Sequence, residues 1–330
     1  MAPLLEVRDL AVSFPGHVAV HGVSFHVDAG ETLALVGESG CGKSVTAFAL
    51  MGLLPSTAKV PRGQALFDGV DLITAPPRVM RDLRGRLISL IQQEPMTSLN
   101  PVLTVGAQIA ETLRRHEKLS RASAWRRAEE LLDLVGIPEP ARRAKEFPHN
   151  FSGGMRQRVM IAMAVACGPK LIIADEPTTA LDVTIQAQVL DLLDDLRRRL
   201  GMALLLITHD LGVVAQWADR ATVMYAGRIV EQASVRPFFR RPRHPYAIGL
   251  LGASVSEDDS AHYTTRRLVE IPGSVASAAG EPGCPFAPRC PQRIAACRVE
   301  VPALRPVEPG WDVACVVASR AEVSHGAAVG

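Results

Sequence analysis

A phosphate-binding pattern stands near the start of this sequence of 330 residues. Residues 37–44 read GESGCGKS and fit the spacing G-x-x-x-x-G-K-[ST], between a strand-like run at 32–36 and a helical run at 45–54. The glycines let backbone N–H groups surround a polyphosphate, and the following helix N-terminus adds a favourable dipole. We expect Lys43 to contact the β- and γ-phosphate oxygens and Ser44 to bind Mg²⁺. The alternative, a glycine-rich turn with a solvated lysine, does not explain why the strand, loop and helix signals agree.

Two carboxylates follow a second apolar run, at residues 171–174. Asp175 suits the water shell of Mg²⁺, as in P-loop enzymes generally. Glu176 is then placed to polarise an attacking water molecule. Alone, this pair would be explained equally well as a strand end that faces solvent. Beside a phosphate-binding loop, the catalytic interpretation is favoured.

The sequence also contains a second possible anion-binding helix start, FSGGMRQR at residues 151–158. A serine followed by two glycines at a helix N-terminus can bind a phosphate through backbone N–H groups. One chain needs only one such cradle for a γ-phosphate, so a second one suggests that two chains meet head to tail. For Ser152, Gly153 and Gly154 taken alone, an ordinary serine N-cap followed by flexible glycines is the better explanation.

Three continuous apolar runs, at 32–36, 171–174 and 203–207, indicate strands buried on both faces of a parallel sheet. The third run ends at Thr208, His209 and Asp210. Ligands of open α/β sheets bind beyond the carboxyl ends of the strands. We therefore expect an α/β fold in which three polar clusters converge on one site.

Other parts of the chain follow different patterns. Residues 1 to about 30 alternate apolar and polar, which predicts antiparallel strands, and residues from about 96 to 165 have helical spacing. Proline and glycine become frequent from about residue 235, and 254–283 resembles a linker. We expect a domain at 1–253 with a helical insert at about 96–165, followed by a small, loop-rich domain at 254–330.

Composition excludes some classes of protein. The formal net charge of +2 lacks the basic excess of a typical nucleic-acid-binding protein. A spanning helix needs about 20 mostly apolar residues, and the longest apolar stretches, 159–167 and 202–207, are shorter. The N-terminus has no apolar signal-peptide core. We expect a cytosolic chain, unless another chain holds it at a membrane.

Four of the six cysteines lie close together near the C-terminus, with the spacing C-x5-C-x6-C-x17-C. In a cytosolic chain such a group indicates a metal site rather than disulfides. Zinc favours tight C-x2–4-C pairs, which are missing here. The wide loops fit a [4Fe–4S] cluster better, while zinc and reduced cysteines in a small core remain alternatives. The four candidate ligands are Cys284, Cys290, Cys297 and Cys315.

The order of these motifs resembles that of the ABC ATPases over roughly residues 5–235. The series is the P-loop, Gln93, SGG at 152–154, Asp175-Glu176, Leu181-Asp182 and His209. The resemblance implies a mixed sheet with flanking helices, an antiparallel subdomain and a helical subdomain. It also implies ATP contacts from Phe14, Gly37, Ser39, Gly40, Cys41, Gly42, Lys43, Ser44, Val45, Gln93, Glu176 and His209.

The same resemblance implies individual roles. Phe14 replaces the commoner tyrosine that stacks on adenine, with core packing as the alternative. Gln93 binds Mg²⁺ together with Ser44 and Asp175 and senses the membrane subunits. The alternative is that Gln93 is a polar loop residue without a role in the site. His209 holds the γ-phosphate and is catalytic together with Glu176 and Gln93, or is a capping or core histidine. The resemblance further implies that the signature segment closes on the ATP of the partner chain through Ser152, Gly153, Gly154 and Met155. It also implies that Asp182 lies at the contact between the two chains.

Two further stretches are similar to the peptide and nickel importer ATPases, QEPMTSLNP at 93–101 and HPY at 244–246. Cys284-Pro285 and Cys290-Pro291 match their C-terminal extension, which carries a [4Fe–4S] cluster in some members. This resemblance implies a peripheral ATPase at the cytoplasmic face, two permease subunits, a second related ATPase chain and an extracytoplasmic solute-binding protein. Peptides are the expected cargo. The alternatives are nickel or another small solute, an exporter, a non-hydrolysing regulatory cassette, and a soluble ABC ATPase without a transport role.

Overall fold

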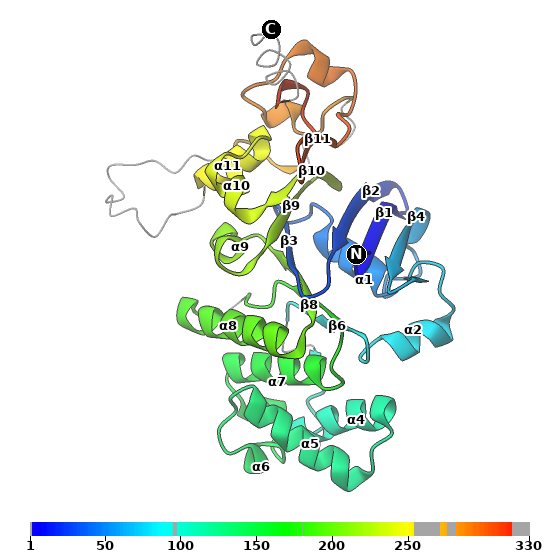
Figure 1. The fold of residues 1–330 in the computed structure, drawn as a ribbon, viewed down its shortest axis with the longest axis vertical. Helices are drawn as coiled ribbons and strands as arrows, with labels where there is room; N and C mark the ends of the chain where they lie inside the picture. The colour runs from blue at the N-terminus through cyan, green and yellow to red at the C-terminus, as the bar shows by residue number, and fades with distance from the viewer. Residues whose placement is uncertain (1, 95–97, 180, 254–270, 276–281, 319–330) are drawn as a thin grey trace. The chain divides into compact units, whose positions relative to one another are not determined.

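The computed structural model describes residues 2–94, 98–179, 181–253, 271–275 and 282–318 (Figure 1). The chain forms two compact units, each built from segments that are distant in sequence. The first unit comprises residues 1–5, 27–32 and 66–207, and the second comprises 6–26, 33–65 and 208–330. The predicted linker lies mostly outside the described residues.

The first unit contains a parallel sheet with the strand order β6-β7-β8. These strands are β6 (Ile88–Ile91), β7 (Leu171–Asp175) and β8 (Ala203–Thr208). Every residue of β7 is buried, as a strand covered on both faces requires. The apolar runs at 171–174 and 203–207 are therefore confirmed as buried parallel strands.

Helix α7 packs against β6, and Figure 1 shows α4, α5 and α6 next to one another. Serine, threonine or aspartate caps the four longest helices: Thr104 for α4, Ser120 for α5, Ser152 for α7 and Asp182 for α8. Helices α4 to α7 lie within the segment of predicted helical spacing. The bounds are α2 (Pro77–Leu83), α4 (Val105–Glu117), α5 (Arg121–Leu134), α6 (Pro140–Arg143), η1 (Pro148–Asn150), α7 (Gly153–Val165) and α8 (Val183–Leu200).

The second unit begins with the predicted N-terminal strands. A two-residue connection joins β1 (Leu5–Phe14) and β2 (His17–Val27) into a hairpin, and β4 (Lys59–Phe67) lies on the other side of β1. The last two residues of β4 belong to the first unit, where they pair with the short β5 (Val70–Asp71).

A second set of strands in this unit joins the start of the chain to its end. The strand β3 (Thr32–Val36) pairs in parallel with β9 (Arg220–Tyr225), which is antiparallel to β10 (Arg228–Ser234). The C-terminal region, predicted to be loop-rich, adds β12 (Trp311–Val313) to β10 and β11 (Arg305–Glu308) to β12. Helices are α1 (Lys43–Leu50), α9 (Leu211–Trp217), α10 (Val235–Arg240), α11 (Pro245–Ala253), η3 (Ala287–Arg289) and η4 (Ala295–Arg298).

One apolar core serves both the strands and the C-terminal region of the second unit. Tyr225 of β9, Tyr246 of α11, Phe286 and Trp311 are all buried in it. Residues on both sides of position 253 thus contribute to the same core. The domain boundary expected there stays a prediction.

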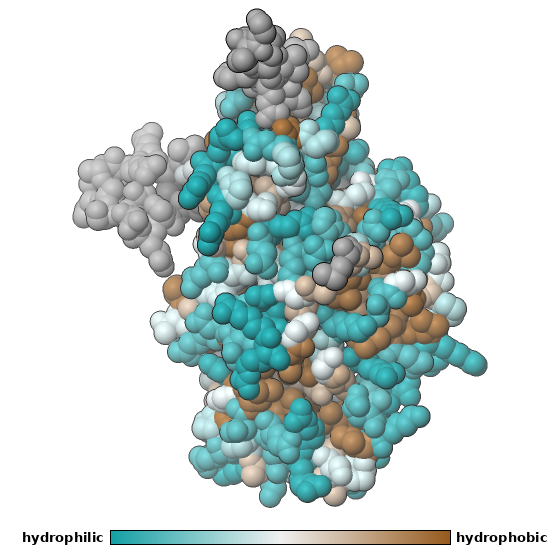
Figure 2. Space-filling model, viewed as in Figure 1, coloured by the Kyte–Doolittle hydropathy of each residue, from teal (hydrophilic) through white to brown (hydrophobic). Residues whose placement is uncertain are grey.

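The visible face of the molecule mixes polar and apolar residues (Figure 2). Among the described residues, the helices are too short or too polar to traverse a bilayer.

Candidate nucleotide site

The P-loop adopts the strand–loop–helix arrangement that its sequence predicts, between β3 and α1. Gly37, Gly40 and Gly42 have φ angles of 154°, 79° and 102°, which favour glycine. A Cβ atom at Gly37 would lie 2.2 Å from the carbonyl oxygen of Met224. Glycine is therefore required at this position for space as well as for conformation.

Lys43 is held inside its own loop. Its side chain is 5% exposed, and Nζ donates to the carbonyl oxygens of Gly37 at 2.7 Å and Glu38 at 3.1 Å. The ammonium group thus occupies the concave side of the loop, where it can exchange backbone carbonyls for phosphate oxygens. Burial raises the pKa of the neighbouring Cys41 thiol, so this side chain behaves as a small buried residue rather than a reactive one.

The acidic pair lies at the end of β7. Asp175 is buried, and Glu176 has a φ of 46°, an unusual value for a residue with a side chain. The Glu176 N–H donates to the carbonyl of Ile207 at 2.9 Å, and its carboxylate accepts from Thr179 Oγ1 at 3.0 Å. Strained backbone of this kind is concentrated at functional sites.

Gln93 is brought to the same carboxylate from the neighbouring strand. It follows β6, and its Nε2 donates to Glu176 Oε2 at 3.0 Å. Because β6 and β7 are paired in parallel, residues beyond their carboxyl ends lie at one edge of the sheet. The structure therefore joins two predicted site residues that are 83 positions apart.

The SGG segment forms a capped helix start. Ser152 Oγ accepts from the N–H of Met155 at 3.3 Å, so its hydroxyl acts as an N-cap in this structure. Asp182 likewise caps α8 by accepting from Ile185 at 2.9 Å. A Cβ atom at Gly154 would lie 2.6 Å from Ile185 Cγ2, whereas one at Gly153 would make only ordinary contact. Gly154 therefore permits the close packing of α7 on α8.

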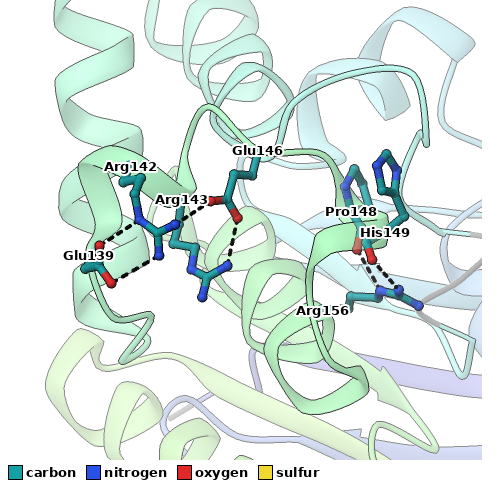
Figure 3. A network of polar contacts seen from close by, with 7 residues as sticks. All are labelled: Glu139, Arg142, Arg143, Glu146, Pro148, His149 and Arg156. Atoms are coloured by element: carbon teal, nitrogen blue, oxygen red, sulfur yellow. Dashed lines mark hydrogen bonds and ion pairs between the residues drawn. The ribbon is translucent and has the colours of Figure 1, made fainter.

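A network of arginines and acids orders the chain that leads into this helix (Figure 3). Arg142 pairs with Glu139 and Glu146, and Arg143 pairs with Glu146 at 2.8 Å. Arg156 of α7 reaches back, and its Nε donates to the carbonyl of Pro148 at 2.8 Å. The ion pairs order residues 139–146, and the Arg156 contact holds residues 148–149 against α7.

Two other predicted site residues lie in the second unit, as the P-loop does. His209 follows β8 and is exposed, while Asp210 makes the capping contacts to α9. Exposure argues against the core alternative for His209, and its contact with the γ-phosphate stays a prediction. Phe14 is half-buried at the end of β1, and its ring stacks on His17 at a centroid distance of 5.3 Å. The first unit carries the remaining ones: Gln93, Ser152, Gly153, Gly154, Met155, Asp175, Glu176 and Asp182.

Two residues around the P-loop were missed by sequence reasoning. Tyr246 Oη accepts a hydrogen bond from the Glu38 N–H, and Arg289 forms an ion pair with the Glu38 carboxylate, both at 2.9 Å. Tyr246 belongs to the HPY stretch that the sequence analysis identified, but that stretch did not predict a contact between Tyr246 and the P-loop. Nothing in the local sequence distinguishes Arg289 from other arginines.

The four C-terminal cysteines all lie in the second unit. Cys297 and Cys315 are buried, and the Cys284 N–H donates to the carbonyl of Cys297 at 2.8 Å. Burial, followed by the charges of the other three thiols, raises the pKa of Cys284 to about 11. Within the described ranges, no three His, Cys, Asp or Glu side chains lie close enough to hold a metal ion. The predicted iron–sulfur site therefore lacks a ready-made ligand group.

Comparison with known proteins begins with the fold. The dimeric ATP-binding cassette MJ0796, solved in a post-hydrolysis state with ADP and Pi, is similar with a TM-score of 0.63 and 26% identity. The likeness covers 70% of this chain and 99% of that one. The class defined by this fold and by the P-loop is that of nucleotide-binding ATPase cassettes, so the predicted α/β fold class is confirmed.

Two family models and close relatives narrow the class. Residues 20–179 match the model "ABC transporter", and residues 230–297 match "Oligopeptide/dipeptide transporter, C-terminal region". The probable peptide ABC transporter ATP-binding protein y4tR of Sinorhizobium fredii is 54% identical over 94% of each chain. The oligopeptide transport ATP-binding protein OppD of Bacillus subtilis is 56% identical over 82% of this chain and 76% of its own. The chain therefore belongs to the ABC transporter family, among its ATP-hydrolysing ATP-binding subunits.

Proposed function

We propose that this chain powers a peptide importer, as a peripheral subunit at the cytoplasmic face of the membrane. The observation that carries the proposal is similarity along nearly the whole chain to ATP-binding proteins named for peptide and oligopeptide transport. The match of residues 230–297 to the oligopeptide/dipeptide C-terminal model favours peptides over nickel or another small solute. It also favours a transport role over a non-transport ATPase. We retain 1–253 as the nucleotide-binding domain and 254–330 as its extension.

The proposed substrate is MgATP, bound by the P-loop. The buried ammonium of Lys43 is held by two loop carbonyls and, more weakly, by Cys41 Sγ, which supports its exchange for β- and γ-phosphate oxygens. Ser44, Gln93 and Asp175 would each offer Mg²⁺ an oxygen ligand of the kind that it prefers. The metal would neutralise charge on the phosphates. Phe14 would stack on the adenine.

Glu176 is the proposed general base. Hydrogen bonds from Gln93 and Thr179 fix the orientation of its carboxylate. A carboxylate held in this way can accept a proton from an attacking water molecule. The exposed imidazole of His209 would donate to the γ-phosphate. The start of α7, with Ser152 and Gly153, would close on the ATP of a second ATPase chain that is related but different. Asp182 would lie at that contact.

The proposed membrane partners are two permease subunits, supplied by a solute-binding protein on the opposite side. Exposed apolar residues support a contact surface in the first unit, since Val102 is 75% exposed and Leu103 and Phe147 are also exposed. The Val105 N–H donates to the Glu146 carbonyl at 2.9 Å, which places these two segments side by side. The balanced charge gives no support to a nucleic-acid partner.

The test is reconstitution of this chain with its permease and binding protein in lipid vesicles. We expect ATP hydrolysis that is stimulated by the peptide-loaded binding protein, together with uptake of labelled peptide. Lys43→Ala should abolish both activities, because the phosphate contact is lost. Uptake of nickel without peptide uptake would contradict the proposed cargo. Absence of ATP turnover would contradict the proposed function as a whole.

We also propose that Cys284, Cys290, Cys297 and Cys315 hold a [4Fe–4S] cluster that stabilises the extension. Each thiolate of such a cluster binds a different iron, so the thiolates are further apart than around one zinc ion. Because no metal-binding group is present among the described residues, the proposal rests on the spacing of the four cysteines and on the wide loops between them. Anaerobically purified protein should show broad visible absorption with iron and sulfide bound; zinc alone, or no metal, contradicts the proposal.

A further inference from the structure

Glu38, the second residue of the P-loop, has all of its polar groups engaged. Its N–H donates to Tyr246 Oη at 2.9 Å, and its carbonyl accepts from Lys43 Nζ at 3.1 Å. Its carboxylate accepts from Arg289 Nη1 at 2.9 Å. Two of these three partners come from the C-terminal part of the chain, more than 200 residues away, and both lie in the same unit as the loop.

Arg289 is built into the structure as a rigid fork. Its side chain is 4% exposed. Beside its bond to Glu38, Nε donates to the carbonyl of Pro272 at 2.8 Å and Nη2 to that of Ile271 at 3.1 Å. A planar guanidinium held at three edges has little freedom to follow a moving partner. A buried cation also requires its carboxylate, because an unpaired buried charge is strongly destabilising.

Tyr246 is fixed just as firmly. Its ring is fully buried, 4.7 Å from that of Tyr225 and 5.4 Å from that of Phe286 between centroids. Its N–H donates to His244 Nδ1 at 3.0 Å. The HPY turn and the segment that contains Phe286 therefore form one packed block, and this block holds the hydroxyl that meets the Glu38 N–H.

The same segment carries two of the C-terminal cysteines. Cys284 lies two residues before Phe286, and Cys290 directly follows Arg289. The 3-10 helix η3 (Ala287–Arg289) connects them, with the Cys290 N–H donating to Ala287 at 3.3 Å. Any change that moves this cysteine segment also moves the guanidinium bonded to the P-loop.

We propose that Arg289 and Tyr246 are positioning residues of the nucleotide site, through which the C-terminal cysteine segment sets the affinity of the P-loop for ATP. The inference rests on the proposed function, in that ATP binds the P-loop. Both residues fix Glu38, and its carbonyl is one of the two that hold Lys43. Without Arg289 and Tyr246, the P-loop must become ordered when ATP binds. The conformational entropy lost in that ordering weakens ATP binding.

The test measures two things. Calorimetry gives the ATP affinity of the full-length chain, and ATPase assays give the KM and kcat of the assembled transporter. Arg289→Met should raise the ATP Kd and KM by about tenfold, the range of a lost coupled contact, while kcat at saturating ATP stays close to wild type. Arg289→Lys should rescue part of the loss, because it keeps the charge beside Glu38. Glu38→Gln combined with Arg289→Met should bind ATP no more weakly than Arg289→Met alone. Arg298→Met, at an exposed arginine of the same region, is the matched control and should change nothing.

Two milder variants keep the inference falsifiable if Arg289→Met does not fold. Tyr246→Phe removes only the hydroxyl that accepts from Glu38, and Glu38→Gln removes only the charge that faces Arg289. Folded variants with wild-type ATP affinity would overturn the inference while leaving the proposed function intact. A folded wild-type chain that binds no ATP would overturn both.

Discussion

Gln93 donates a hydrogen bond of 3.0 Å to the carboxylate of Glu176, and so joins the ends of two neighbouring parallel strands. The register pairs Ile91 of β6 with Ala174 of β7, each two residues before one of these side chains. The Glu176 backbone is strained at a φ of 46°, and the amide of Gln93 orients its carboxylate. A movement of the segment that carries Gln93 would therefore reorient the proposed general base.

Replacing the proposed base should separate ATP binding from hydrolysis. Glu176→Gln keeps the size and hydrogen-bonding capacity of the side chain but cannot accept a proton. We expect ATP turnover to fall by about 100-fold or more, the usual contribution of a general base, while ATP still binds. The trapped ATP should also hold two chains together, which size-exclusion chromatography with ATP measures. Glu300→Gln, at an exposed position, is the control; wild-type turnover in Glu176→Gln would contradict the role.

Removing the Gln93 amide should affect coupling more than binding. Gln93→Ala removes one donor to the Glu176 carboxylate and keeps the hydrogen bond from Thr179. We expect ATP affinity to stay near wild type, whereas the stimulation of hydrolysis by the loaded binding protein is lost. Calorimetry and vesicle ATPase assays provide the two readouts. A variant that retains full stimulation would show that the Gln93–Glu176 bond carries no signal.

Gly154 should be needed for stability as well as for any contact with nucleotide. An added Cβ would lie 2.6 Å from Ile185 Cγ2. We expect Gly154→Ala to lower the free energy of unfolding by about 1–3 kcal/mol, as overpacking does. Ile185→Ala removes the clashing methyl and should restore part of this loss in the double variant. Gly153→Ala is the matched control, since its Cβ would meet Leu181 Cδ2 at an ordinary 3.5 Å. Equal denaturation midpoints for both alanine variants would contradict the packing explanation.

His244 should make the stability of the protein depend on pH. Burial lowers the pKa of this imidazole from 6.5 to about 3. Between these values the unfolded chain binds a proton that the folded chain does not, so stability is lost as pH falls. The slope reaches about 1.4 kcal/mol per pH unit for one proton. His244→Asn keeps an acceptor for the Tyr246 N–H without titrating.

Chemical denaturation from neutral pH downward tests this dependence. The free energy of unfolding of His244→Asn should fall less steeply with acid than that of the wild type. His149→Asn, at an exposed histidine, should keep the wild-type slope. Equal slopes for wild type and His244→Asn would mean that the imidazole is not held neutral by burial.

The sequence by itself determined the elements that depend on local pattern. The P-loop needs three glycines with positive φ, and those glycines lie at fixed spacing between a strand and a helix. The continuous apolar runs identified β3, β7 and β8, because strands buried on both faces cannot alternate with polar residues. The order of the motifs was enough to predict the family.

Tertiary structure alone decided which distant residues meet. Gln93 reaches Glu176 because β6 and β7 pair, and strand pairing is fixed by packing rather than by either strand's own pattern. The addition of β12 to β10 was hidden because β12 has only three residues. The Arg289–Glu38 ion pair was hidden for a different reason: a buried arginine requires a carboxylate, but its sequence neighbours do not specify which one.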